Sequence, residues 1–229
     1  MILFYSSQIN VSRAVLEEEE FRHCCVVLRH KEDDIIKVTD GNGKLATARI
    51  TICHKKHADL EVLSLDQAPQ KAKRISIGIA PPKNRNRWEW FLEKSVEIGV
   101  DNIIPLICQN SERKKINLER NMKIMRSAAL QSLRTHHPEI HEPVSLKSFI
   151  KTVDKTESDL ILAHYHPENT ELTSFPMSND HQIILIGPEG DFSPAELKFL
   201  QNEGFISLNI SDNRLRTETA GIVALCSII

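Results

Sequence analysis

The sequence predicts an α/β protein in two parts, a small β-rich N-terminal region followed by a mostly parallel sheet covered by helices. In the first part, Asp40-Gly41-Asn42-Gly43 separates two β-rich runs, which is a strong hairpin signal. In the second part, short apolar runs alternate with segments of helical periodicity, the pattern of a parallel sheet with helical connections. A polar, proline-containing stretch at 66–73 divides the two patterns.

Composition indicates a globular protein without a general affinity for nucleic acid. The chain has 229 residues, 41% hydrophobic and 26% charged, which is enough for one large or two small domains. Its formal net charge of −2 provides no overall attraction to phosphates, although a local basic patch remains open.

Cysteine usage and the N-terminal segment favour a cytoplasmic protein. The five cysteines form no C-x-x-C pair, which indicates free thiols in a reducing compartment. The first residues lack the pattern of a signal peptide, and no run approaches the roughly 18 apolar residues of a membrane span. His136, His137 and His141 lie close together without companion ligands in a metal spacing, so we expect a surface loop and no metal.

The N-terminal region is predicted to form a small β-barrel or sandwich. The two runs around the hairpin turn provide two strands, and "DLEVLSLD" alternates apolar and polar residues as a third.

The second region contains five short runs typical of buried strands. These runs are 75–80, 102–108, 159–164, 182–187 and 206–210.

Three helices are predicted between or beside these strands, at 86–99, 117–133 and 193–204. In the first, Trp88 belongs to an apolar face with Phe91, while Trp90 points elsewhere and could stack on a base. The third begins with a capping box. The apolar face of the first helix comprises Trp88, Phe91, Leu92, Ser95 and Val96, and Gly99 is its C-cap. The residues that begin and end the third helix are Ser193, Pro194, Glu196 and Gly204.

Two loops are candidates for a binding site. "LIGPEGDFSPAEL" is a strand, a tight loop and a capped helix, and ligands of open α/β sheets bind beyond the carboxyl ends of strands. It lacks the spacing and the lysine of a phosphate loop, and an ordinary β-α turn is the alternative. The polar segment 211–219 follows the last strand and precedes an apolar terminal helix.

If the last two strands neighbour each other in the sheet, these two loops form one crevice, with His164 at the end of a third strand as another wall. The simpler alternatives are an N-cap role for Thr217 and a solvated turn for Arg216 and Glu218.

Taken together, these motifs resemble the RsmE family of SPOUT-class methyltransferases. "LIGPEGDFS" and "RLRTETAGIVAL" look like its signature loops, and "HCCVVLRHKEDDIIKVTDGNG" resembles its PUA-like domain. "KNRNRWEWFLEKSVEIGVDNIIPL", "SERKK" and "AALQSLRTHHPEI" are similar to its central region, so the resemblance covers nearly the whole chain. Three places depart from the family pattern: Asp33 and Asp191 stand where glycine is frequent, and Ser211-Asp212-Asn213 replaces a common turn.

The resemblance implies a small PUA-like β-barrel at 1–70 that binds RNA and a SPOUT methyltransferase domain at 71–229. The latter is an α/β-knot, a mostly parallel sheet with a C-terminal trefoil knot. The implied cofactor is S-adenosylmethionine, and the implied reaction is methylation of N3 of a specific uridine in 16S ribosomal RNA of the small ribosomal subunit. The implied assembly is a homodimer formed through the knot region.

The resemblance also implies roles for individual residues. We expect Arg216 to stabilise the uridine anion, with Glu218, or else Glu189, as general base. The expected cofactor-binding residues are His164, Ile186, Gly187, Pro188, Glu189, Gly190, Ile210, Ser211, Leu215, Arg216 and Thr217. The expected RNA-binding residues are Arg13, Arg22, Arg29, Lys83, Arg85, Arg87, Arg113 and Lys114.

Two other functions stay open on the sequence alone. One is an RNA-binding assembly factor that keeps the fold but has lost methylation, which the altered turn at 211–213 favours. The other is a knotted methyltransferase that acts on another RNA position or on ribose.

Overall fold

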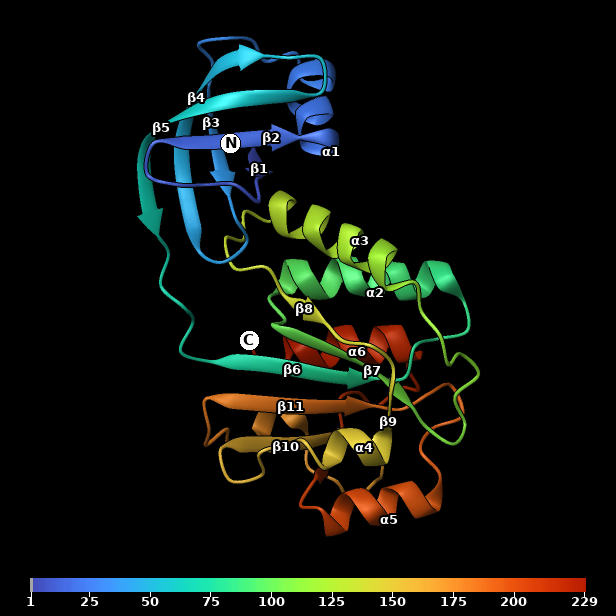
Figure 1. Ribbon diagram of the computed structural model, residues 1–229. Coiled ribbons are helices and arrows are strands. Elements are labelled where there is room, and N and C mark those ends of the chain that lie inside the picture. The colour runs from blue at the N-terminus through green and yellow to red at the C-terminus, as the bar shows by residue number, and fades with distance from the viewer. Residues whose placement is uncertain (1) are drawn as a thin grey trace. The chain divides into compact units, whose positions relative to one another are not determined.

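The computed structural model describes residues 2–229 and forms two compact units (Figure 1). One unit holds the chain up to Lys71 together with Ala129–His137, and the other holds Ala72–Ala128 and Pro138–Ile229. No helix among the described residues is long and apolar enough to cross a membrane.

The first unit is a curled five-stranded sheet with strand order β1-β3-β4-β5-β2. Its strands are β1 (Leu3–Tyr5), β2 (Arg13–Glu17), β3 (Ile35–Thr39), β4 (Lys44–Cys53) and β5 (His57–Gln67). The predicted hairpin is confirmed, because β3 and β4 pair antiparallel with Thr39 opposite Leu45. The two edge strands approach each other where Ser6 Oγ donates to the Val15 carbonyl at 2.6 Å.

A helical segment in this unit was not predicted. A short helix α1 (Glu18–Phe21) runs directly into a π-helical turn, η1 (Arg22–Val27). Phe21 and Cys24 from this segment are buried in the same core as Leu16 of β2. Three consecutive glutamates begin the segment, which suits the positive end of a helix.

The second unit is built on a seven-stranded sheet in which β12-β10-β11-β6-β7-β8 lie in order and β9 also pairs with β7. All of these pairings are parallel. The strands are β6 (Arg74–Ile79), β7 (Asn102–Ile107), β8 (Glu139–Ile140), β9 (Val144–Ser145), β10 (Ser158–Ala163), β11 (His181–Ile186) and β12 (Ile206–Leu208). All five predicted strands are present, while the two-residue strands β8 and β9 were missed.

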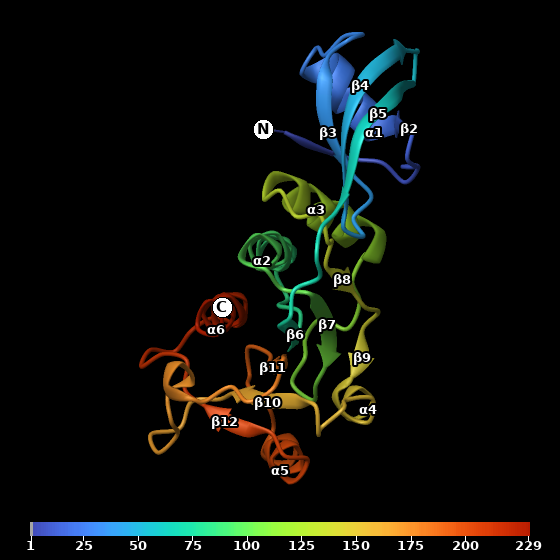
Figure 2. The ribbon, with the colours of Figure 1, turned by 90° about the vertical axis from the view of Figure 1, so that its left-hand side faces the viewer.

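Helices cover both faces of this sheet (Figure 2). α2 (Arg85–Ile98) and α6 (Thr217–Cys226) lie on one face, and α4 (Leu146–Ile150) and α5 (Pro194–Asn202) lie on the other. Two further segments are α3 (Leu118–Gln131) and the 3₁₀ turn η2 (Leu172–Ser174).

Helix α2 buries the apolar face that its periodicity predicts. Trp88 and Phe91 are 1% and 0% exposed, whereas Trp90 is 43% exposed. The helix ends at Gly99, whose φ of 124° is one that other residues rarely adopt. Helix α6 packs closely on α2, since a Cβ added at Gly221 would lie 2.6 Å from the Phe91 ring.

Helix α5 begins as predicted. The Ser193 side chain accepts from the Glu196 backbone amide, and the Glu196 carboxylate accepts from the Ser193 amide, so the capping box is complete.

The condition that the last two strands are neighbours in the sheet is not met. β11 and β12 follow each other along the chain but are not neighbours in the sheet, because β10 lies between them and pairs with both. The two candidate loops therefore do not extend from adjacent strands. Whether they still meet depends on contacts made beyond the strand ends.

Candidate functional site

The two candidate loops meet beyond the carboxyl ends of the strands. Thr217 Oγ1 donates to the Gly187 carbonyl at 3.2 Å, and Arg214 Nη2 lies 3.5 Å from the Glu189 carbonyl oxygen. His164 follows β10, and its Nδ1 lies 3.0 Å from Asp191 Oδ2. Loops from β10, β11 and β12 thus form one cluster, even though β11 and β12 are separated in the sheet.

Two glycines let this cluster pack tightly. A Cβ at Gly187 would lie 3.1 Å from the Phe192 ring, and one at Gly190 would lie 3.3 Å from Asn110 Cβ. Both distances are shorter than ordinary van der Waals contact, so side chains at these positions would push the loop outward. The two glycines therefore let the side chains of Phe192 and Asn110 approach the loop backbone closely.

Asp191, which stands where a glycine is frequent, takes the backbone conformation that glycine favours. Its φ is 60°, and the Phe192 amide donates to Asp191 Oδ1 at 2.7 Å. Short polar residues tolerate this conformation because their side chains bond to the nearby backbone. Asp33, the other such departure, also has a positive φ, 72°.

A residue missed by the sequence analysis supports the same loop. Asn110, in the turn after β7, donates through Nδ2 to the carbonyls of Gly190 and Asp191 at 3.2 and 3.0 Å. Its only signal in the sequence is its place just after a predicted strand. The contacting partner cannot be inferred from that place.

Arg216 and Glu218 differ strongly in their surroundings. Arg216 is exposed and occupies the N-cap position of α6 without a side-chain cap bond, so the alternative in which Thr217 is a simple N-cap is wrong. Glu218 is only 6% exposed, and its Oε1 lies 3.5 Å from Arg87 Nε. Arg216 is therefore open to an incoming substrate, whereas Glu218 is enclosed and faces a guanidinium.

The remaining expected cofactor residues line the same region. Ile186 and Pro188 are buried and Ile210 and Leu215 are half-buried, so apolar side chains border polar backbone. The Ser211 hydroxyl accepts from the Asn213 amide at 3.1 Å, and this bond closes the turn Ser211-Asp212-Asn213, which departs from the family pattern. A mostly apolar pocket with a few polar groups is typical of small-molecule sites.

Glu189 links the crevice to the segment that follows β6. Its Oε1 accepts from the Lys83 backbone amide at 2.9 Å. The ion pair between Lys83 Nζ and Glu112, at 2.7 Å, together with the nearby Glu189 carboxylate raises the pKa of Lys83. Arg113 Nη2 donates to the Lys83 carbonyl at 2.5 Å, so two expected RNA-binding residues belong to one network.

Acidic partners also restrain Arg85. Arg85 Nε donates to Glu89 at 2.6 Å, and Arg120 donates to the same carboxylate through Nε and Nη2 at 2.7 and 2.9 Å. Bonds from Arg120 first, and then from Arg85, lower the pKa of Glu89 to about 2. Arg85 is thus held in place at the first residue of α2, so the basic residues overlap the first turn of the helix. Lys114 is exposed.

The three basic residues expected to bind RNA in the first unit are exposed. Arg13 lies on β2 opposite Glu61 of β5. Arg22 begins the π-helical turn, and Arg29 follows it with a φ of 61°.

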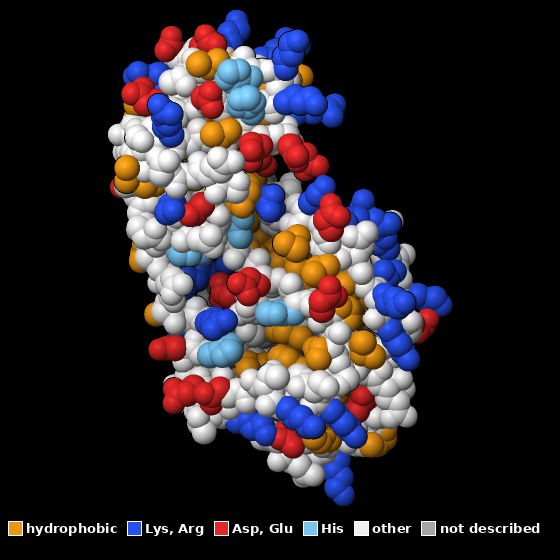
Figure 3. Space-filling model, viewed as in Figure 1, with side chains coloured by type: hydrophobic (Ala, Val, Ile, Leu, Met, Phe, Trp, Pro, Cys, Tyr) orange, Lys and Arg blue, Asp and Glu red, His pale blue; other side chains and the backbone are white. Residues whose placement is uncertain are grey.

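A separate hollow of about 550 Å³ lies at the opposite, amino ends of the strands in the second unit. It is lined by Ser76, Asn102 and His181 from strand starts and by apolar Ile104 and Ile183. Figure 3 shows this face, where apolar side chains lie beside histidines and charged residues. None of the expected site residues lies in this hollow.

The fold and the joined loops define a class: an α/β domain whose loops meet beyond the carboxyl ends of a parallel sheet, preceded by a small β domain. A model of the RNA methyltransferase domain matches residues 69–229, and a model of the RNA methyltransferase PUA domain matches residues 16–63. The chain belongs to the RNA methyltransferase family represented by ribosomal RNA small subunit methyltransferase E. The predicted fold class, a SPOUT-type α/β domain after a PUA-like domain, is confirmed.

Relatives match along nearly the full length. The chain is 35% identical to a probable rRNA-methyltransferase from Porphyromonas gingivalis, with a TM-score of 0.90, covering 100% of this chain and 97% of that chain. It is 27% identical to ribosomal RNA small subunit methyltransferase E from Neisseria gonorrhoeae bound to S-adenosyl methionine, with a TM-score of 0.88, covering 100% and 96%. The enzyme of the same name from Aquifex aeolicus is 26% identical, over 100% of this chain and 99% of its own.

Proposed function

We propose that this protein transfers a methyl group from S-adenosylmethionine to N3 of a specific uridine in 16S ribosomal RNA, within the small ribosomal subunit. The supporting observation is the joined pair of loops, in which Thr217 binds Gly187 and Arg216 stays exposed beside them. The similarity to small-subunit methyltransferases supports the substrate class. We place this activity in the cytoplasm, where ribosomal subunits assemble.

The residues of the joined loops support S-adenosylmethionine as the cofactor. The cofactor combines an adenine ring with a charged amino-acid part, and the loops combine half-buried Ile210 and Leu215 with polar backbone groups. We assign the adenosine part to the backbone of Ile186, Gly187 and Leu215 with these apolar side chains. When bound, the cofactor supplies an electrophilic methyl group on a sulfonium.

The protein must make N3 of uridine nucleophilic, because this nitrogen carries a proton at neutral pH. We assign the exposed guanidinium of Arg216 to the uridine carbonyl oxygens, where negative charge develops as the proton leaves. Glu218 is the candidate general base, and its partner Arg87 fixes the orientation of its carboxylate. The protein also holds the uridine ring in line with the methyl group of the cofactor. This orientation contributes the rest of the rate enhancement.

The two units receive complementary roles in this proposal. Residues 1–70 form the RNA-binding domain, using Arg13, Arg22 and Arg29, and residues 71–229 form the methyltransferase domain. Neutralisation of phosphates makes such binding weaken steeply with salt. Two copies of the chain associate through the loops and α6, and light scattering of the purified protein measures the expected dimer mass.

The deciding experiment is methylation of purified small subunits that lack the modification. Incubation with labelled S-adenosylmethionine, followed by mass spectrometry of the digested RNA, identifies the modified nucleoside. We expect N3-methyluridine at one position. A methyl group on ribose or on another base would overturn the assigned position. If calorimetry detects no binding of S-adenosylmethionine, an RNA-binding assembly factor is favoured instead.

A further inference from the structure

The β4–β5 hairpin of the first unit places two histidines and an aspartate together, away from the crevice. A two-residue turn, Lys55-Lys56, connects the strands, and the His54 amide donates to the His57 carbonyl at 2.9 Å. His54 and His57 therefore face each other across the hairpin, with their side chains on the same side. Asp59 lies two residues further along β5, so its side chain is on that side too.

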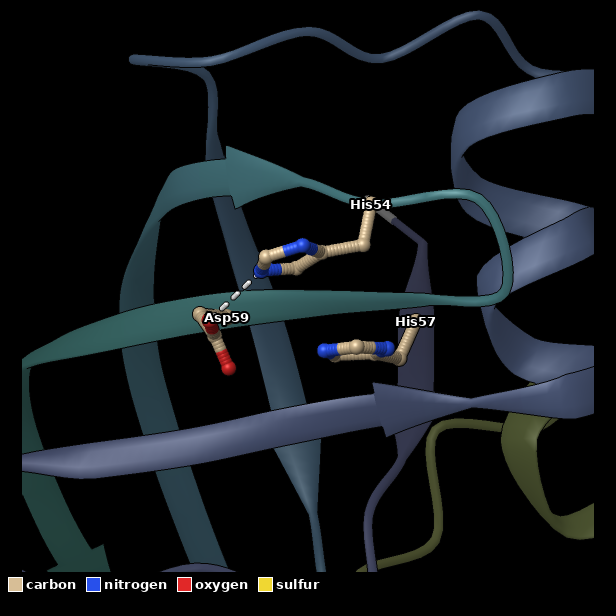
Figure 4. Close-up of side chains that lie close together, drawn as sticks. All are labelled: His54, His57 and Asp59. Carbon is tan, nitrogen blue, oxygen red and sulfur yellow. Dashed lines mark hydrogen bonds and ion pairs between the residues drawn. The ribbon is translucent and has the colours of Figure 1, made fainter.

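Their polar atoms converge. The two imidazole rings are stacked with centroids 4.1 Å apart and an interplanar angle of 17°. His54 Nε2 lies 3.0 Å from Asp59 Oδ2, and one ligand atom from each residue lies within 4.8 Å of the others. Figure 4 shows both rings directing a nitrogen toward the Asp59 side of the hairpin.

A fourth ligand is within reach from the neighbouring strand. Glu17 of β2 pairs directly with His57 of β5 in the antiparallel ladder. Directly opposite Cβ atoms are about 5 Å apart, so the Glu17 carboxylate can approach the His57 ring. A hollow of about 410 Å³ beside these residues is lined by Glu17, Glu18, His57 and Asp59.

We propose that His54, His57 and Asp59, with Glu17 as a fourth ligand, bind a divalent first-row transition ion such as Zn²⁺. Two imidazoles and two carboxylates are a donor set suited to this class of ion, whereas Mg²⁺ and Ca²⁺ prefer oxygen alone. Ligand bonds of about 2.0–2.2 Å require the rings to tilt toward each other. Exposed side chains can tilt in this way, and His54 and Asp59 are 40% and 43% exposed.

The hydrogen bond to the Asp59 carboxylate requires a proton on His54 Nε2. When Nε2 binds the ion, this proton leaves to solvent and Nδ1 takes one up, so the imidazole stays neutral and changes its tautomer. The carboxylates of Glu17, Glu18 and Asp59 outweigh the ammonium of Lys56 in the hollow, so the local charge favours a cation. The ion joins β4, β5 and β2 at the end of the hairpin.

The nearby thiols are the main rival ligands. Cys25 and Cys53 have their sulfur atoms 3.7 Å apart, and Cys53 precedes His54. These sulfur atoms are not among the ligand atoms of His54, His57 and Asp59 that converge within 4.8 Å. A Cys25→Ser variant, which removes one of the two thiols, distinguishes the two sites.

The test is a titration of the metal-free full chain with Co²⁺ and then Zn²⁺. We expect one equivalent of Co²⁺ to give visible bands without sulfur charge transfer, and Zn²⁺ to displace it and raise the unfolding temperature. His57→Ala and His54→Ala should each weaken Co²⁺ binding by about 100-fold, and Glu17→Gln by about tenfold.

The matched controls are His141→Ala, which removes an exposed histidine of the other unit, and Cys25→Ser. Both should bind Co²⁺ as the unchanged chain does, with circular dichroism confirming that each variant folds. Unchanged affinity in His57→Ala and Glu17→Gln, no binding by the unchanged chain, or loss of binding in Cys25→Ser would each overturn the proposal.

Discussion

The two ends of the parallel sheet in the second unit are built differently. At the amino ends, buried Asp159 accepts from the backbone amides of Ser178 and Asn179 and from two side-chain amides. His181 is bonded through both ring nitrogens to Ser76 and Ser158. At the carboxyl ends, the loops meet through a few bonds of 3.0–3.5 Å, and the exposed side chain of Arg216 makes no cap bond to α6.

This difference separates stability from function within one sheet. A buried network whose groups are paired holds the strand starts together and is costly to break. Substitutions in loops with glycines and exposed charges change the stability of the fold little, and such loops can accommodate a ligand. Substitutions at the amino ends should therefore affect unfolding, and those at the carboxyl ends should affect methyl transfer.

The largest effect is expected for Arg216→Ala. Loss of the guanidinium removes the proposed stabilisation of the uridine anion, and kcat/KM should fall by about 100-fold or more. The urea midpoint should stay close to that of the unchanged protein, because the side chain is exposed and makes no cap bond. Lys198→Ala, an exposed cation on α5, is the control. Unchanged single-turnover methylation in Arg216→Ala would remove the assigned role.

Asp159→Ala should have the opposite profile. It removes the buried carboxylate that accepts from Ser178, Asn179 and Gln182, so the free energy of unfolding should fall by about 3 kcal/mol, as urea denaturation measures. Methylation should stay normal at temperatures where the variant is folded. Asp159→Asn, which keeps one acceptor oxygen, should lose less. A selective loss of activity would show that the two ends are coupled.

His181 makes the stability of the amino ends of the strands depend on pH. Burial first, and then the charge of Arg74, lowers its pKa from 6.5. The unfolded chain therefore binds a proton more readily, and this contribution to stability is complete above about pH 6.5 and decreases as the pH falls. When the pH is lowered from about 7.5 to about 5.5, the free energy of unfolding measured with urea should fall less in His181→Gln than in the unchanged chain. Parallel curves would contradict this account.

The smallest effect is expected for Asp191→Gly. Glycine relieves a backbone held at a φ of 60°, but it removes bonds to Phe192 and His164. These opposing terms should leave the unfolding free energy within about 1 kcal/mol of its starting value. Calorimetric affinity for S-adenosylmethionine reports whether the loop keeps its shape. A large loss of affinity would show that the side chain itself is required.

The sequence predicted the parts that depend on local patterns. The α2 face, the capping box at Ser193 and the hairpin at Asp40–Gly43 follow from periodicity and turn chemistry. The order of the strands was not available, because pairing in a parallel sheet depends on contacts distant in sequence.

The same limit applies to the candidate site. Arg216 and Glu218 were found together in one segment, but the ion pair of Glu218 joins it to Arg87, which lies far away along the chain. Asn110 was missed for the same reason. His54 and His57 are three residues apart and Asp59 two further, so a search for alternating ligands around a two-residue turn could have found them.

The position of β10 between β11 and β12 also sets an order of folding. β12 is joined to β11 only through β10, so the loop that contributes Thr217 is brought to Gly187 once β10 has paired with both strands. Contacts of such long sequence separation form slowly, since their loop-closure entropy must be overcome first. We therefore expect the binding crevice to mature after the sheet, so that a newly made chain passes through a folded but inactive stage.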